Sequence, residues 1–334
     1  MSASPRPHTA VRTPMTERPA RRRRSWVLVP SLLAAAVPLG CSGLGKPEHT
    51  TPPVVAPQAA PRGMLPAFVG AVLPPAKRPA AYTSRLGPYA FHTEFPLDVA
   101  EPLYRELEDL PEQIERELQL TCGQSLIQIF LFDDEEKYHA FLRAKDPKLP
   151  LRSAYFFAEP ARGYANAPDL HVYTWFSPRL KTDLRHELTH ALLHGSLKSV
   201  PIWLDEGLAG FFEQSPANDG VNIMHLDSLR TSDSPRVADL ARLEKLREVS
   251  QMGRVEYQES WAWVHYLLRG EAAARKVFLE HLKALRGNPS VGPLLSKLET
   301  EVGDPNAAML RHLSRLELPA RAKATGPITA TIPR

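Results

Sequence analysis

The chain has 334 residues, 43% of them hydrophobic, so it is long enough to bury the core of one large domain or two small ones. Its formal net charge of +4 comes from one end: residues 1–24 hold seven arginines and one glutamate, a net +6, which leaves −2 for the remaining residues. A basic character confined to the first 24 residues does not support nucleic-acid binding, so we predict no nucleic-acid partner.

The basic residues precede a segment with the layout of a secretory signal. Arg21–Arg24 form a cationic run, Trp26–Gly40 carries no charge, and Cys41 follows. The apolar stretch is shorter than the roughly 20 residues that span a bilayer. Residues Val37–Cys41 resemble a bacterial lipobox, in which cleavage leaves the cysteine as a lipid-modified N-terminus.

We therefore predict a signal peptide over residues 1–40, with Met15 as an alternative start, and a lipid on Cys41. The protein would be exported and anchored by lipid to the membrane of the cell envelope, on its periplasmic or extracytoplasmic face. A cleaved signal without lipid and an uncleaved anchor are the alternatives. Residues 41–80 are predicted to be a tether, because residues 42–80 contain nine prolines and few charges.

The first half of the predicted domain, residues 81–318, reads mainly as strands. Short apolar or alternating runs predict strands over 89–95, 125–132, 154–158 and 170–176. Apolar residues at steps of three and four predict a helix over 98–120, kinked or broken at Pro111. Asp133, followed three residues later by Glu136, predicts the cap of another helix.

From Ser177 onward the pattern is helical. Ser177-Pro178 predicts the start of a helix that runs to His194 and ends at Gly195. Further helices are predicted over 201–212, 256–268, 272–285, 291–298 and 305–316, followed by a loose tail over 319–334. Strands first and helices afterwards predict an α+β fold with a small N-terminal sheet and a helical C-terminal half.

The motif His-Glu-Leu-Thr-His occupies residues 186–190, on the helix that follows Pro178. Residues four apart on a helix differ by about 40° in direction and about 6 Å in height, so His186 and His190 face one point and can share one metal ion. Glu187 lies beside that point without aiming at it, which suits a carboxylate that accepts a proton from a water at the metal. Zinc prefers such nitrogen ligands, and catalytic zinc sites keep one of four positions open.

A candidate third ligand lies on the next predicted helix, in the run Trp-Leu-Asp-Glu-Gly-Leu-Ala over residues 203–209. His-Glu-x-x-His followed by a helix bearing Trp-Leu-x-Glu-Gly-Leu-Ala resembles the gluzincin branch of zinc metallopeptidases, and more closely the peptidase-MA-like domains of bacterial lipoproteins. The resemblance covers residues 185–212 and extends, more weakly, to the helix that contains residues 257–261. In that pattern the glutamate of the second motif is the third zinc ligand, and here it is Glu206.

The resemblance implies a zincin-like catalytic domain that hydrolyses peptide bonds in a peptide or protein substrate. The implied cofactor is one Zn²⁺ ion, held by His186, His190 and Glu206, with Glu187 as the general base. The resemblance also implies that the strand at 170–176 is the sheet edge along which an extended peptide lies.

Several side chains near the motifs receive a structural interpretation. His194 lies about 12 Å along the helix from the first motif histidine, so it is interpreted as a helix-end residue. Asp205 points about 100° away from the third ligand and is interpreted either as a support for the ligands or as a surface residue. Glu213 is interpreted as solvent-facing, and Gly207 as a residue that lets the second motif helix approach the first.

Two other functions stay open. Gly210 occupies the position where an acidic residue would usually support a ligated histidine, so a catalytically weak or inactive zinc-binding lipoprotein, acting as a binding or scaffold module, is an alternative. A structural zinc site would have its fourth position closed by Asp205 or His194. The donor that stabilises the transition state is left open between Tyr257, His265 and Tyr173.

Overall fold

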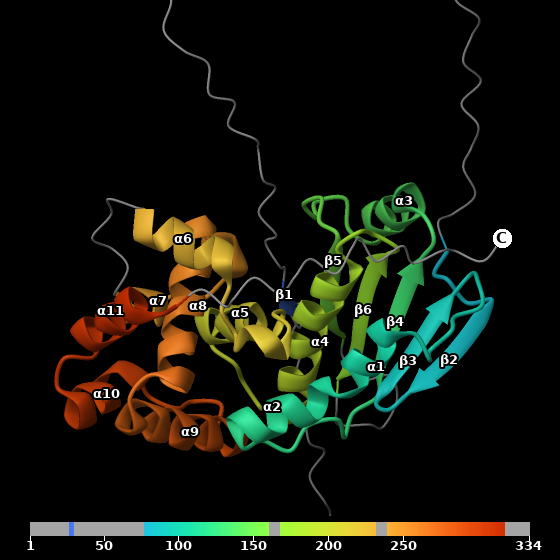
Figure 1. Cartoon of the computed structure of the whole chain (residues 1–334). Coiled ribbons are helices and arrows are strands. Elements are labelled where there is room, and N and C mark those ends of the chain that lie inside the picture. Colours follow the sequence, from blue (N-terminus) through green and yellow to red (C-terminus); the bar gives the residue numbers. More distant parts are fainter. Residues whose placement is uncertain (1–26, 30–76, 160–167, 232–238, 318–334) are drawn as a thin grey trace, which may run out of the picture.

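A computed structural model of the chain describes residues 27–29, 77–159, 168–231 and 239–317 (Figure 1). The fold is α+β, as the sequence predicts. The predicted signal peptide apart from residues 27–29, the tether up to residue 76, Cys41 and the tail over 319–334 lie outside the described residues. Within the described ranges, the helices are all too short or too polar to cross a membrane.

A mixed sheet of order β1-β5-β6-β4-β3-β2 forms one side of the molecule (Figure 1). Strands β3, β4 and β6 run parallel to one another. Strand β2 pairs with β3, and β5 pairs with β6, in antiparallel register. The strands are β1 (Val27–Val29), β2 (Tyr82–Leu86), β3 (Tyr89–Thr93), β4 (Ile127–Phe132), β5 (Ala154–Glu159) and β6 (Asp169–Trp175). Strand β2, which the sequence did not predict, turns into β3 through Gly87, whose positive φ of 50° favours glycine.

The strand predicted as the sheet edge is not at the edge. It is β6, which pairs with β4 on one side and with β5 on the other. The edge strand on this side is β1, which pairs with β5 in antiparallel register. The prediction was wrong because an alternating pattern reports which faces of a strand are buried, and β6 is buried on both, but not which strands lie beside it.

The two faces of the sheet are covered by different helices. Helix α4 (Leu180–Ser196) lies against β5 and β6 on one face, flanked by α1 (Pro102–Glu108) and α2 (Leu110–Leu118). Helix α3 (Glu135–Lys145) covers the other face, over a separate aromatic cluster. The buried members of that cluster are Phe130, Phe132, Tyr138, Leu142, Tyr155, Phe157 and Tyr173.

Two helix boundaries in this half bear on the predictions. The helix predicted over 98–120 is broken into α1 and α2 beside Pro111, which occupies the first turn of α2. Helix α3 is capped by Asp134, whose carboxylate accepts hydrogen bonds from the amides of Glu136 and Lys137. The predicted cap, Asp133, instead pairs with the Nζ of Lys137 at 2.7 Å, because a capping side chain must lie directly before the first turn.

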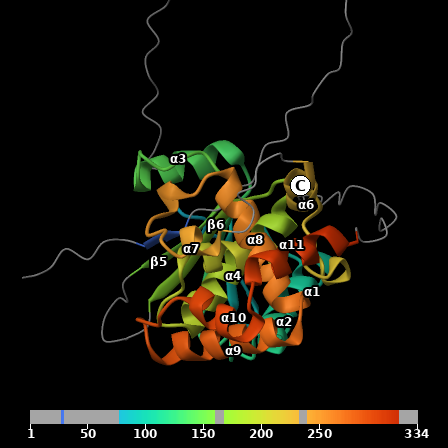
Figure 2. The ribbon, with the colours of Figure 1, turned by 90° about the vertical axis from the view of Figure 1, so that its left-hand side faces the viewer.

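The C-terminal half is helical, and its first helix, α5, lies between α4 and α8 (Figure 1). Figures 1 and 2 both place α6 at the same end of the molecule as α3, with α9 and α10 at the opposite end. The helices are α5 (Ile202–Phe212), α6 (Ile223–Thr231), α7 (Leu240–Leu243), α8 (Arg254–Arg269), α9 (Ala272–Gly287), α10 (Leu294–Val302) and α11 (Pro305–Arg315).

The close contact between α5 and α8 depends on Gly207. A Cβ atom at this position would lie 2.5 Å from the carbonyl oxygen of Ser260 and 2.7 Å from Cγ2 of Val264, so any larger residue would force the helices apart. The glycine therefore lets the second motif helix approach α8, not the first motif helix as predicted.

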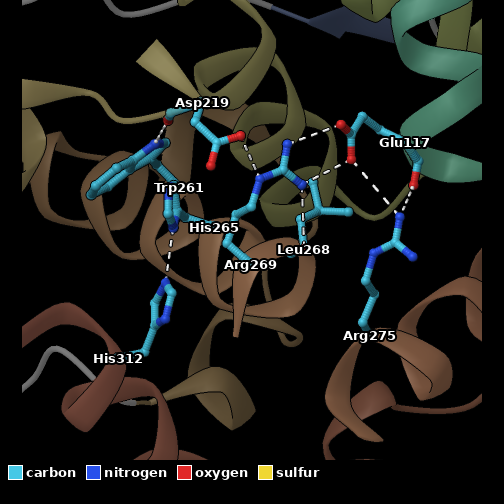
Figure 3. A network of polar contacts seen from close by, with 9 residues as sticks. Glu117, Asp219, Trp261, His265, Leu268, Arg269, Arg275 and His312 are labelled. Carbon is cyan, nitrogen blue, oxygen red and sulfur yellow. Dashed lines mark hydrogen bonds and ion pairs between the residues drawn. The ribbon is translucent and has the colours of Figure 1, made fainter. Parts of the chain in front are cut away.

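Arg269, at the end of α8, joins the helical half to α2 (Figure 3). Its two Nη atoms donate to the carboxylate of Glu117 at 2.8 and 2.9 Å, and its Nε donates to Asp219 at 2.7 Å. Such a two-pronged pair fixes both distance and direction, so α8 is held in register with the half of the molecule that contains the sheet.

Candidate metal centre

The His-Glu-Leu-Thr-His motif lies on the most deeply buried part of α4. Every residue from Asp183 to Leu193 is buried, because this stretch lies between the sheet and α5. The neighbouring Arg185 is 1% exposed. Its Nε donates to the carbonyl oxygen of Phe212 at 2.9 Å and its Nη2 donates to Gln113 at 3.0 Å. These bonds hold the end of α5 and helix α2 against the motif helix.

Three side chains from α4 and α5 converge on one point. The Nε2 atoms of His186 and His190 lie 3.5 and 3.6 Å from the same carboxylate oxygen, Oε2 of Glu206. The candidate ligand atoms all lie within 4.8 Å of one another. A tetrahedral zinc site with bonds of about 2.1 Å has ligand atoms about 3.4 Å apart. The separations therefore match those around a single small cation.

The polar atoms at this point are buried without hydrogen-bond partners among the described residues. These atoms are Nε2 of His186, Nε2 of His190 and both carboxylate oxygens of Glu206. Nitrogen lone pairs and carboxylate oxygens repel one another unless a proton or cation lies between them, and buried polar atoms without partners are rare. The donor set and its lack of partners fit a divalent metal ion, and nitrogen and carboxylate ligands are those that zinc prefers.

His186 is oriented by a carboxylate from the end of α5. Its Nδ1 lies 2.7 Å from Oε2 of Glu213, and the other oxygen of Glu213 accepts hydrogen bonds from Asn222 at 2.8 Å and Gln214 at 3.2 Å. When Nδ1 carries the proton and donates it to Glu213, the lone pair of Nε2 faces the metal point. Glu213 is thus buried beside a ligand, and the prediction that it faces solvent was wrong.

His190 has a similar support. Its Nδ1 lies 2.9 Å from Oδ1 of Asp205, and Oδ2 of Asp205 lies 2.8 Å from Nε2 of His194. The ring of His194 lies against Phe156, with the centroids 5.3 Å apart. Of the two interpretations of Asp205, the structure therefore supports the one in which it assists a ligand. His194 is more than a helix-end residue, because it holds that aspartate.

The pKa values of these groups shift as the contacts dictate. Burial alone would lower the pKa of His186, but Glu206 and Glu213 raise it well above its ordinary value. Burial would raise the pKa of Asp205, yet the charges of His190 and His194 lower it below its usual range. Asp205 is therefore a carboxylate at neutral pH.

Glu187 is buried beside the metal point, with 0% of its surface exposed. Its charge reaches the phenols around it. Burial raises the pKa of Tyr138, and the charge of Glu187 raises it further. Burial and then the charge of Glu206 raise the pKa of Tyr257, partly opposed by Arg152, and Glu187 contributes as well. The charge of Glu187 thus acts on the candidate ligand His186 and on two phenols that keep their protons.

A cleft of about 470 Å³ opens onto the candidate metal ligands His186 and Glu206. Helices α4, α5, α6 and α8 contribute to its walls. The lining residues are Arg179, Thr182, His186, Glu206, Gly210, Glu213, Gln214, Asn222, Ile223, Met224, His225, Arg254, Tyr257 and Gln258. Because two of the candidate ligands face this cleft, a small molecule or peptide can reach the candidate metal point.

Of the three proposed transition-state donors, Tyr257 is the one that lines this cleft. His265 lies 2.9 Å from His312 within the helical half (Figure 3), and burial, together with the neighbouring charges, lowers its pKa to about 3. Tyr173 stacks on Phe130 on the sheet face away from α4, with the ring centroids 5.0 Å apart. Position therefore separates three residues that the sequence left equivalent.

Glu213 was missed, although the sequence contains a signal for it. It follows Glu206 by seven residues, about two helical turns, so both carboxylates lie on nearly the same side of the α5 axis. A second acidic residue at that spacing from a candidate ligand indicates a partner for a ligating histidine. Asn222, the partner of Glu213, has no such signal because it reaches the site from the loop before α6.

The fold and the site together define an α+β protein with a buried candidate metal centre of two histidines and one glutamate beside an open cleft. A family described as "Protein of unknown function (DUF1570)" matches residues 182–286, a range that spans both motifs and α8. No curated protein matches the chain.

Among solved structures, the chain is similar to a mutant M1 zinc metallopeptidase from Deinococcus radiodurans, with a TM-score of 0.33 and 17% identity over 73% of this chain and 54% of that one. A mutant two-domain M1 zinc metallopeptidase bound to L-arginine matches with a TM-score of 0.34 and 18% identity over the same shares of the two chains. The chain thus spans about half the length of these structures.

Proposed function

We propose that this protein is a zinc-dependent metallopeptidase. The observation that carries the proposal is the convergence of His186, His190 and Glu206, whose buried atoms have no hydrogen-bond partners, at the end of a cleft large enough for a peptide side chain. When bound there, a zinc ion supplies a Lewis acid that makes a water more acidic and polarises a carbonyl oxygen.

Two side chains of the protein supply the other catalytic roles, a general base and a hydrogen-bond donor. Glu187 accepts the proton of the attacking water and returns it to the leaving amine, a role that needs a carboxylate beside the ligands but not among them. Tyr257 keeps its phenolic proton, because burial and the charge of Glu206 raise its pKa. Its hydroxyl can therefore donate a hydrogen bond to the oxygen on which negative charge develops.

The test of this function is the substitution Glu187→Gln. The variant should keep one equivalent of zinc, measured by metal analysis of the purified protein. It should lose cleavage of a broad peptide library by a factor of about 100 to 10,000, because it lacks the general base. The substitution Glu135→Gln, on the exposed start of α3, is the matched control and should change neither reading. Full activity of the Glu187→Gln protein would refute the assignment.

The observations no longer favour the two alternatives. An inactive scaffold was suggested by the absence of an acidic residue at Gly210, but Asp205 and Glu213 supply that support from other positions. A structural zinc site required Asp205 or His194 to close the fourth position. These two side chains bind each other, and the ligands face a cleft.

Export and lipid anchoring through Cys41 remain part of the proposal, on the evidence of the sequence alone. A protein expressed from its full gene should be found in the membrane fraction, with an N-terminal peptide that begins at Cys41 and carries the mass of acyl chains. The substitution Cys41→Ser should release it from the membrane, and a native protein whose Cys41 thiol is unmodified would contradict the anchor.

A further inference from the structure

The charge that the cleft offers to a ligand is positive. Its two lining carboxylates are both committed to the metal centre: Glu206 faces the histidine Nε2 atoms, and Glu213 binds His186 and Asn222. The other charged residues of the lining are two arginines, Arg179 and Arg254.

The two arginines are not equivalent. The Nε of Arg179 lies 3.9 Å from Oδ1 of the buried Asp183, so a carboxylate already balances part of its charge. Arg254 is exposed and forms no hydrogen bond or ion pair with the described part of the chain. It is the first residue of α8, where the helix dipole adds to its positive potential. Arg254 is therefore the cation of the cleft that is available to a ligand.

An apolar surface from α6 lies in the same cleft. Ile223 and Met224 are 45% and 53% exposed, and both line the cavity. The next residue, His225, also lines it. Arg254 lines the same cavity, so this arginine and the apolar side chains border one space. A free cation beside exposed apolar side chains, in a cavity next to the metal point, is a composition that selects a ligand by both charge and shape.

We propose that Arg254 makes this cleft selective for peptides that place a carboxylate against it and an apolar side chain against Ile223 and Met224. This inference rests on the proposed peptidase function and names its substrate class. An acidic side chain and the C-terminal carboxylate of a peptide present the same chemistry to the guanidinium, which binds either with two parallel hydrogen bonds.

The test measures binding to the zinc-loaded Glu187→Gln protein, so that cleavage does not intervene. Four fluorescein-labelled hexapeptides contain leucine next to glutamate or glutamine, each with a free or an amidated C-terminus. Peptides with the recognised carboxylate should bind about five-fold more tightly than their neutral counterparts, the effect of one partly exposed charge pair. Glutamate against glutamine reports a side-chain carboxylate, and the free against the amidated end reports a terminal one.

Variants of the arginine make the assignment specific. Arg254→Ala should remove the preference, and Arg254→Glu should reverse it in favour of a hexapeptide with lysine in place of glutamate. Arg286→Ala, a matched change on α9 outside the cleft lining, should leave the preference intact. A preference that survives Arg254→Ala, or its absence from the Arg254-containing protein, would overturn the inference.

The outcome is separable from that of the peptidase proposal. Should the protein with Glu187 cleave no peptide while the binding preference follows Arg254, the enzyme assignment fails and the carboxylate site stands. Should it cleave peptides without regard to acidic groups, and bind all four probes equally, the carboxylate site fails and the enzyme assignment stands.

Discussion

Asp205 shows how one side chain can contact a candidate metal ligand and a second histidine together. Its two oxygens face two histidines of α4: Oδ1 lies 2.9 Å from Nδ1 of His190, and Oδ2 lies 2.8 Å from Nε2 of His194. The first contact places a negative charge beside the ring of the candidate ligand, and the second, a hydrogen bond, fixes the aspartate itself. His194 is thereby connected to the metal point without being able to reach it.

This connection predicts a graded loss of zinc affinity. Asp205→Asn removes the charge that holds the His190 ring and should weaken zinc binding by about 10- to 100-fold, the usual effect of losing a partner of a ligating histidine. His194→Ala leaves the contact with His190 in place and should weaken binding less. Competition with a chelator of known zinc affinity measures both effects, with the exposed Glu135→Gln variant as the control. Equal affinities for all the variants would contradict the role of Asp205.

The site residues that could be predicted from the sequence lie on one helix, whereas those that could not depend on how separate elements pack. His186, Glu187 and His190 lie within one helical turn, so their relative directions follow from helix geometry alone. Glu206 depended on a resemblance, because the placement of one helix against another is not encoded in a local pattern. The role of Arg254 depends on which of two arginines has a nearby carboxylate, and only tertiary structure contains that information.

At the scale of elements, two boundaries set by proline were predicted well, whereas α4 runs through Gly195, its predicted stop, to Ser196. Helix α5 begins after Pro201 and ends at Phe212 as expected, and Pro111 marks the break between α1 and α2. Helix α6 was missed because two of its apolar residues, Ile223 and Met224, face the cleft, so its sequence lacks a clean apolar face toward the core. The same exposure gives α6 the apolar surface that the proposed carboxylate-selective cleft uses.

Sheet order was the other error at this scale, and it has a functional consequence. The prediction placed the peptide-binding edge at the strand that proved to be β6. The edge on that side of the sheet is β1, and its neighbour β5 packs against α4. Edge position is decided by pairing between strands far apart in the chain, and alternation within one strand does not report it.

Over the whole molecule, buried histidines connect folding to pH. His281 on α9 is 3% exposed, and its Nδ1 lies 3.5 Å from the Nζ of Lys297. Burial, reinforced by the charge of Lys297, lowers the pKa of His281 from 6.5 to about 4. In the unfolded chain His281 therefore binds a proton below pH 6.5, whereas in the folded chain it binds one only below about pH 4.

The sign of the resulting pH dependence follows directly. The contribution of a neutral, buried His281 to stability is fully present above pH 6.5 and is lost as the pH falls toward 4. His281→Gln keeps an acceptor for Lys297 but has no such proton, so its free energy of unfolding should fall less with acidification, by about 2 kcal/mol near pH 4.5. Urea unfolding of the metal-free proteins at several pH values measures the difference. Because His281 lies outside the metal centre, the zinc-loaded proteins should show the same difference. Parallel curves for the two proteins would contradict the prediction, because they would mean that His281 has the same pKa in the folded and the unfolded chain.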